Sequence, residues 1–131
     1  MSNEELIKIA IEASKNSYSP YSNFKVGVVL LARSGNVYMG TNIENASYSA
    51  TICAERVAFF KAISEGEKDF EKIVIVGGEN NDFSKMCSPC GMCRQVISEF
   101  CKPDFKFILG NKNLEYEEYT LNDLLPHGFK L

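Results

Sequence analysis

Residues 51–100 read TICAERVAFFKAISEGEKDFEKIVIVGGENNDFSKMCSPCGMCRQVISEF, and this segment decides the fold. At its centre, Ile73-Val74-Ile75-Val76 is a continuous apolar run that two glycines follow. Such a run is typical of a strand that is buried on both faces of a sheet. The segments on either side, about 53–65 and 90–100, have helical patterns, and Gly66 ends the first of them. A helix–strand–helix order of this kind predicts a layered α/β protein.

The flanking segments supply the other expected elements. Ser2 and Glu5 have the spacing of a helix capping box, and a hairpin turn is expected at Ser34-Gly35-Asn36. Ser49 or Thr51 is expected to cap the helix that begins near residue 53. The whole set predicts an α/β fold in which a mixed five-stranded sheet lies between helices, a three-layer α/β/α sandwich. The predicted elements outside the central segment are a helix over 3–16, strands over 24–32, 37–42, 105–109 and 114–119, and a short helix over 121–125.

Length and charge limit the possible functions. The 131 residues fit a single domain, 1–131, with a core of its own. The net charge is −3 and Lys and Arg form no cluster, so nucleic acid is not an expected partner. No apolar run reaches the roughly 20 residues that cross a bilayer, and the acidic N-terminus lacks the pattern of a secretory signal. We therefore expect a cytoplasmic protein with no membrane partner, whose five cysteines are metal ligands or nucleophiles rather than a disulfide framework.

Two short fragments contain three of the cysteines: Cys53-Ala54-Glu55-Arg56 and Pro89-Cys90-Gly91-Met92-Cys93-Arg94. Cys90 and Cys93 are three apart, so their sulfurs lie on one face of a first helical turn. Cys53 begins the other helix of the central segment. A helix N-terminus favours a thiolate through its unpaired N–H groups and its dipole. Three thiolates can hold one Zn²⁺ and leave its fourth position open, which is the catalytic rather than the structural type of zinc site.

Charged residues stand next to these cysteines. Glu55 is expected within reach of a water molecule at the open position. Three thiolates exceed the charge of Zn²⁺ by one unit. Arg56 and Arg94, each next to a ligand, are therefore expected to return positive charge by hydrogen-bonding the sulfurs. Without the cysteines, Glu55 would be interpreted as an exposed carboxylate in a first helical turn.

Other interpretations of the cysteines stay open, because structural zinc sites and redox proteins also use a Cys-x-x-Cys pair. Cys87 could close a four-cysteine site, although we expect it to be a buried or loop thiol. An iron–sulfur cluster on Cys87, Cys90 and Cys93 is disfavoured because Cys101 lies too far along the chain to be the fourth ligand. Cys101 instead continues an apolar helix face and is expected in the core. His127, the only histidine, is expected at the surface.

At these residues the chain resembles the cytidine deaminase family, small zinc enzymes that act on free nucleosides. The resemblance covers nearly the whole chain. It implies the fold of that family, one Zn²⁺ per subunit, and hydrolytic deamination of cytidine and 2′-deoxycytidine to uridine and 2′-deoxyuridine with release of ammonia, a step of pyrimidine salvage. The stretches that carry it are Tyr21-Ser22-Asn23-Phe24-Lys25-Val26-Gly27, Gly40-Thr41-Asn42-Ile43-Glu44-Asn45-Ala46-Ser47-Tyr48, Cys53-Ala54-Glu55-Arg56, Pro89-Cys90-Gly91-Met92-Cys93-Arg94-Gln95-Val96, Leu124-Leu125-Pro126 and Phe129.

The resemblance also implies roles for single residues. Glu55 would move a proton from water to N3 of the pyrimidine and a second one to the departing ammonia, beside a zinc ion on Cys53, Cys90 and Cys93. The ribose hydroxyls would lie on Asn42 and Glu44; by themselves these are ordinary loop residues. Phe24, otherwise a core residue at a strand start, would pack against the substrate, and the backbone of Ala54 would contact the base. Family members of this length are homotetramers, so neighbouring subunits are expected to complete each site with Ala46, Tyr48 and Phe129.

Three rival functions can be distinguished from this one. Related small deaminases act on cytosine-containing antibiotics such as blasticidin S, but Arg56 and the Asn42/Glu44 pair favour the nucleoside branch. Deaminases of polynucleotides usually have a histidine ligand and basic surfaces, and this sequence has neither. The rival from another class is a module whose zinc only stabilises the fold, or a redox protein that uses Cys90 and Cys93.

Overall fold

The computed structural model describes all 131 residues. Every predicted helix and strand is present, with ends that differ from the prediction by a few residues. The loop after the second strand also contains a short 3₁₀ helix, which the sequence did not predict. In chain order the elements are α1 (Asn3–Ser14), β1 (Phe24–Ala32), β2 (Val37–Thr41), η1 (Tyr48–Ala50), α2 (Ala54–Ser64), β3 (Phe70–Glu79), α3 (Gly91–Phe100), β4 (Lys106–Gly110), β5 (Tyr116–Thr120) and α4 (Leu121–Leu124).

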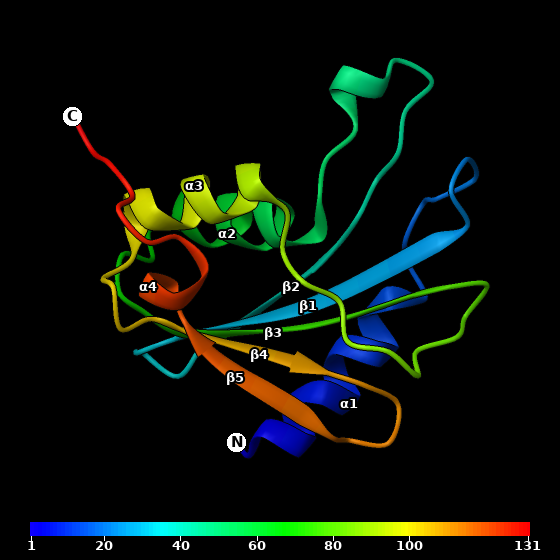
Figure 1. Cartoon of the computed structure of the whole chain (residues 1–131), viewed down its shortest axis with the longest axis horizontal. Helices are drawn as coiled ribbons and strands as arrows, with labels where there is room; N and C mark the ends of the chain where they lie inside the picture. The colour runs from blue at the N-terminus through cyan, green and yellow to red at the C-terminus, as the bar shows by residue number, and fades with distance from the viewer.

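The strands form one five-stranded sheet in the order β2-β1-β3-β4-β5. Only β3 and β4 pair in parallel, with Ile73 opposite Phe107; the other neighbours are antiparallel. Helix α1 covers one face of this sheet, and α2 and α3 cover the other (Figure 1). The mixed sheet and the three layers are those predicted from the sequence.

Strand β3 is the centre of the core, as its apolar run predicted. Ile73 and Ile75 pack into the cluster under α2 and α3, whereas Val74 and Val76 pack with the residues of α1. All four side chains are fully buried. Burying each contributes about 1.5–3 kcal/mol relative to leaving it exposed, so this strand fixes both helical layers.

Two glycines let the helices approach the sheet. A Cβ at Gly40 on β2 would lie 2.4 Å from the Ala54 carbonyl oxygen, and one at Gly27 on β1 would lie 2.0 Å from that of Ala10. Both distances are below van der Waals contact, so only glycine allows these positions to touch helix backbone. Because Ala54 is the first residue of α2, Gly40 sets the height of the start of α2 above the sheet.

The helix starts differ in how they are capped. Ser2 caps α1 by accepting a hydrogen bond from the Glu5 N–H, as predicted. The predicted cap of α2 is wrong: its N-cap is Cys53, and Thr51 instead accepts a bond from the Asn45 N–H. The N-cap of α3 is Cys90, and neither cysteine makes a side-chain cap bond. The N–H groups of both first turns are therefore left for other partners.

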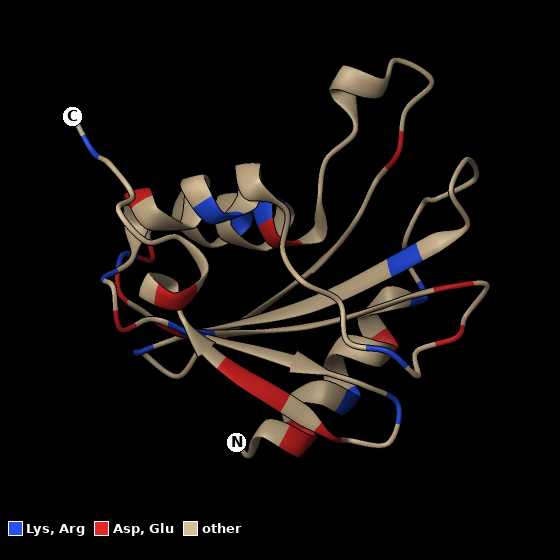
Figure 2. Cartoon of the chain, viewed as in Figure 1, with Lys and Arg blue, Asp and Glu red and all other residues tan.

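The charges are distributed over the whole fold. Lys and Arg are scattered along several elements rather than gathered on one, and the edge strand β5 carries an acidic stretch (Figure 2). Charged residues on an edge strand discourage pairing with another sheet. No helix has the length and apolar character needed to cross a membrane.

Candidate metal centre

The first turns of α2 and α3 bring three thiols together above the sheet. The Sγ atoms of Cys53 and Cys90 are 3.6 Å apart, and those of Cys90 and Cys93 are 3.3 Å apart. All three sulfurs lie within 4.8 Å of one another. The two segments that hold them come together because β3, between them in sequence, is the central strand that both helices cover (Figure 1).

This trio fits a zinc ion. A tetrahedral Zn²⁺ with Zn–S bonds of about 2.3 Å places its sulfurs about 3.8 Å apart, close to the separations observed. No fourth cysteine, histidine or carboxylate belongs to the group. Cys87 lies outside it, with its sulfur against Gly77 and 3.9 Å from the Ser88 carbonyl oxygen. The arrangement is therefore that of an open site with three protein ligands, not a closed four-cysteine site.

The three thiols share charge unequally. Hydrogen bonding from the Cys93 thiol and from Arg56 lowers the pKa of Cys53 to about 5. The pKa of Cys93 is raised, because its thiol donates to the Cys53 thiolate and is buried. The lowered pKa favours the thiolate form of Cys53, and a thiolate in the group favours capture of a cation.

The two arginines behave differently. Arg56 donates from Nη2 to the Cys53 sulfur at 3.5 Å, as expected, and its Nε is buried without a protein partner. Arg56 thus places positive charge beside three thiols whose combined charge, as thiolates, would exceed that of Zn²⁺ by one unit. Arg94 does not make the expected bond to a sulfur. It donates to the carbonyl oxygens of Pro89 and Leu124, because the turn before α3 and the end of α4 present these acceptors to its guanidinium.

Glu55 is buried beside the cysteines, 4% exposed, and is not the solvated first-turn carboxylate of the alternative interpretation. Burial raises the pKa of its carboxyl to about 7, and the charge on Cys53 adds to the rise. A carboxyl with a pKa near neutrality can both accept and release a proton at physiological pH. Buried acids with perturbed pKa values are common at functional sites, so Glu55 also marks this cluster as a candidate site.

Three residues expected to contact the substrate lie near one another at the start of β1. Phe24 is half-buried, and its ring approaches Gly77. Asn42 donates to the Phe24 carbonyl oxygen at 2.8 Å and accepts from the Val26 N–H at 2.9 Å. Glu44 accepts from backbone and side chain of the neighbouring turn. These polar side chains are held in fixed orientations and are not freely solvated loop residues.

Ala46, Tyr48 and Phe129 lie away from the cysteines of their own chain, whereas Ala54 directly follows Cys53. Ala46 and Tyr48 lie in the exposed loop that projects beyond the N-terminal end of α2, whereas the C-terminal tail lies on the other side of the molecule (Figure 1). In this tail, the Phe129 carbonyl oxygen accepts a hydrogen bond from Gln95 of α3. Tyr48 is 77% exposed and meets Tyr21 edge to face, with centroids 6.3 Å apart. Ala54 is buried, with its N–H at the first position of α2.

Sequence reasoning gave no role to Ser17 and Ser22. Ser17 donates to the Asn42 carboxamide oxygen, and Ser22 donates to the Glu44 carboxylate. Each bond spans more than twenty residues of sequence, so no local pattern indicated it. A parallel bridge between Tyr18 and Ile43, beyond the β1–β2 ladder, brings these segments together.

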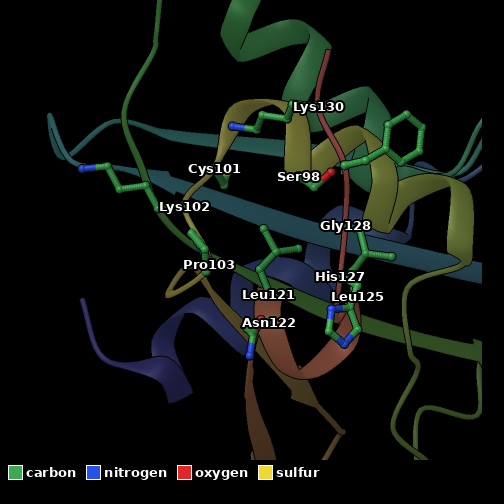
Figure 3. A pocket seen from close by; sticks show the side chains of 11 residues that line it. Ser98, Cys101, Lys102, Pro103, Leu121, Asn122, Leu125, His127, Gly128 and Lys130 are labelled. Carbon is green, nitrogen blue, oxygen red and sulfur yellow. The ribbon is translucent and has the colours of Figure 1, made fainter.

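A hollow of about 490 Å³ lies at the other end of α3 (Figure 3). It is bounded by α3, α4 and the tail, and Cys101, Leu121 and His127 are among its lining residues. Cys101 is buried in the core as predicted, and His127 is exposed as predicted. No second cluster of metal-ligating side chains occurs there, so the hollow is separate from the chemistry.

Comparison with known proteins agrees with this site. Residues 1–109 match the model of the "Cytidine and deoxycytidylate deaminase zinc-binding region". A cytidine deaminase of Halalkalibacterium halodurans is 48% identical over 129 residues, which cover 98% of this chain and 95% of that protein. The crystal structure of cytidine deaminase from Burkholderia pseudomallei matches with a TM-score of 0.90 and 40% identity, covering 98% of this chain and 100% of that one. A blasticidin-S deaminase of Bacillus cereus is 33% identical over 126 residues, covering 93% of this chain and 88% of its own.

Proposed function

The chain belongs to the zinc-binding cytidine and deoxycytidylate deaminase family, and from this premise we propose that it is a cytidine deaminase, hydrolysing cytidine to uridine and ammonia. The observation that carries the proposal is the meeting of three sulfurs within 4.8 Å at two helix N-termini, with a buried carboxyl beside them. A zinc module that only stabilises the fold would not need a buried acid with a pKa near 7.

Cys53, Cys90 and Cys93 are the residues that would hold the zinc ion, which supplies Lewis-acid activation of a water molecule. Glu55 takes a proton from that water and delivers it to N3 of the pyrimidine. The water oxygen adds to C4, and the same carboxyl then carries the remaining proton from this oxygen to the amino nitrogen, which leaves C4 as ammonia while the C4–O bond becomes the carbonyl of uridine. Its burial suits this work, because a pKa of about 7 lets one group act first as base and then as acid.

The remaining residues balance the charge of the thiolates or position the substrate. Arg56 offsets the excess negative charge of the thiolates through its bond to Cys53. The exposed part of the Phe24 ring packs against the substrate, and Asn42 and Glu44 bind the sugar. Arg94 supports the site at a distance, since it joins the turn before Cys90 to the end of α4.

We further propose that the protein also deaminates 2′-deoxycytidine in pyrimidine salvage, works in the cytoplasm as one domain, and forms a homotetramer. A reducing compartment suits five free cysteines of which three are ligands. The exposure of Tyr48 and Phe129, at 77% and 67%, suits residues that enter a neighbour's site together with Ala46. Light scattering should then give four times the chain mass of 14.7 kDa; a monomer that deaminates at full rate would contradict the shared sites.

The test of the proposed activity is a substrate panel. Zinc-loaded protein is incubated with cytidine, 2′-deoxycytidine, cytosine, CMP and blasticidin S, and ammonia release and the ultraviolet change of the base are followed. We expect turnover of the two nucleosides well above that of the other compounds. Preference for blasticidin S would move the chain to the antibiotic deaminases, and preference for CMP would contradict a site that contains no phosphate cradle.

A further inference from the structure

The turn before β1 is bound to Glu44 by three hydrogen bonds. The Tyr21 and Ser22 N–H groups donate to Glu44 Oε1 at 2.9 and 3.2 Å, and the Ser22 hydroxyl donates to Oε2. The Ser22 bond is also the main cause of the lowered pKa of Glu44. This carboxylate is therefore charged and held at both oxygens before any ligand arrives.

The same hydroxyl also holds the backbone of Phe24. Ser22 Oγ accepts a hydrogen bond from the Phe24 N–H at 3.0 Å while it donates to Glu44. On the other side, Asn42 binds the Phe24 carbonyl oxygen. Ser22 is thus the one side chain that links the residue proposed to pack on the substrate to the carboxylate proposed to bind the sugar.

The hydrogen-bond capacity of Glu44 is nearly used. A carboxylate has about four acceptor positions. The two N–H groups fill those of Oε1 and the Ser22 hydroxyl fills one of Oε2. One acceptor position remains, on the oxygen that Ser22 orients. Ser22 and Glu44 also line an open hollow of about 370 Å³, so a ligand has access to that position.

We propose that Ser22 is a positioning residue for the sugar of the nucleoside: its hydroxyl fixes Glu44 at a set distance from Phe24 and directs the free acceptor position to a sugar hydroxyl. This inference rests on the proposed function, because it takes Glu44 as a sugar-binding group. Without the hydroxyl, Oε2 loses its only protein donor and the carboxylate can turn about the bonds to Oε1. The cost should appear in binding of the sugar and not in the chemistry at Glu55.

The chain offers a matched control at Ser34. The Ser34 hydroxyl donates to Glu67 Oε1 at 2.7 Å and accepts from the Asn36 N–H at 3.3 Å. It therefore repeats the pattern of Ser22, a serine that joins a glutamate to the N–H two residues ahead. We call the Ser34–Glu67 pair the hairpin clip. It links the β1–β2 hairpin to the loop after α2, outside the proposed site.

The experiment measures KM and kcat for the wild type, Ser22→Ala, Ser22→Thr and Ser34→Ala with cytidine and with 2′,3′-dideoxycytidine. For cytidine we expect Ser22→Ala to raise KM about three- to tenfold with kcat within about twofold, Ser22→Thr to restore KM, and Ser34→Ala to have no effect. For the dideoxynucleoside, which lacks both ring hydroxyls, the KM difference between wild type and Ser22→Ala should disappear.

Two results would overturn the inference: an unchanged KM in Ser22→Ala, or an equal KM rise for both substrates, which would indicate a merely structural role. Should Ser22→Ala fold poorly, the coupling is measured with Ser22→Thr and Ser22→Cys, in which KM should rise only where the hydroxyl is lost. Failure of the wild type to turn over cytidine would instead reject the proposed function, so the two failures are distinguishable.

Discussion

Helix α3 has a cysteine at each end, in contrasting surroundings. At the N-terminal end, Cys90 and Cys93 lie beside Cys53 of α2, with Glu55 buried next to them. At the C-terminal end, Cys101 has no other cysteine beside it and lines a hollow of about 490 Å³. Burial raises the pKa of Cys101 to about 12, whereas neighbouring donors lower that of Cys53 to about 5.

The difference shows what sets the three clustered thiols apart from Cys101. The first condition is a place at a helix N-terminus, which offers unpaired N–H groups rather than carbonyl oxygens; this place does not lower the pKa by itself, because the pKa of Cys93 is raised. The second condition is another helix N-terminus at the same place, which α2 supplies.

The strongest test of this comparison exchanges sulfur for oxygen at each end of α3. Cys93→Ser should lower the zinc content from about one ion per chain to nearly none and abolish turnover, because a serine hydroxyl is a poor ligand at neutral pH. Cys101→Ser should keep the zinc and lose about 1–3 kcal/mol of stability from the buried hydroxyl. Elemental analysis and denaturant unfolding measure both; equal zinc loss in the two variants would remove the distinction.

The next largest effect separates metal binding from catalysis at the N-terminal end. Glu55→Gln should keep the zinc and the fold but lower kcat about 10²–10⁴-fold, because an amide cannot take up and release the proton. Glu67→Gln, which changes the glutamate of the hairpin clip, is the control and should keep kcat. Unchanged turnover in Glu55→Gln would mean that the metal site is active without a proton-transferring carboxyl at position 55.

Thiol reactivity sharpens the comparison in the metal-free protein. Cys53 should be alkylated at neutral pH at least about a hundredfold faster than Cys101, since only the thiolate reacts. The sign of the pH dependence follows from the lowered pKa: the Cys53 rate should persist as pH falls and decline only near pH 5. Mass spectrometry of alkylated peptides measures it, and zinc should protect Cys53. An alkylation rate of Cys53 that already declines below the ordinary cysteine pKa, at about pH 8–9, would contradict the lowered pKa of this thiol.

The smallest expected effect concerns how α2 is held beside α3. Gly40→Ala and Gly27→Ala should each cost about 1–3 kcal/mol or more of stability, because the added methyl group meets helix backbone. Only Gly40→Ala should also weaken zinc affinity, by about tenfold, since it displaces Ala54 between Cys53 and Glu55. Competition with a chelator measures the affinity; equal weakening in Gly27→Ala would show that stability alone decides it.

Much of this could be predicted from the sequence, for reasons that differ between residues. Cys90 and Cys93 are local neighbours, so their spacing alone places the sulfurs on one face of a turn. The buried strand around Ile73–Val76 follows from its apolar run. The cap of α2 was predicted wrongly because Thr51 binds the Asn45 N–H within its own loop, and the partner of Arg94 because one acceptor, the Leu124 carbonyl oxygen, lies 30 residues away in sequence. The Ser22–Glu44 bond has no local signal at all.

By itself, the sequence determined the order of elements, the layered sheet and the identity of the three thiols, because periodicity and short spacings act within a few residues of the chain. Only the tertiary structure decided that Glu55 is buried with a pKa near neutrality, that Cys87 stays outside the trio, and that Ser22 holds Glu44. Burial, electrostatic coupling and contacts across strands depend on distances in space, which the packing of α2 and α3 on the central strand sets.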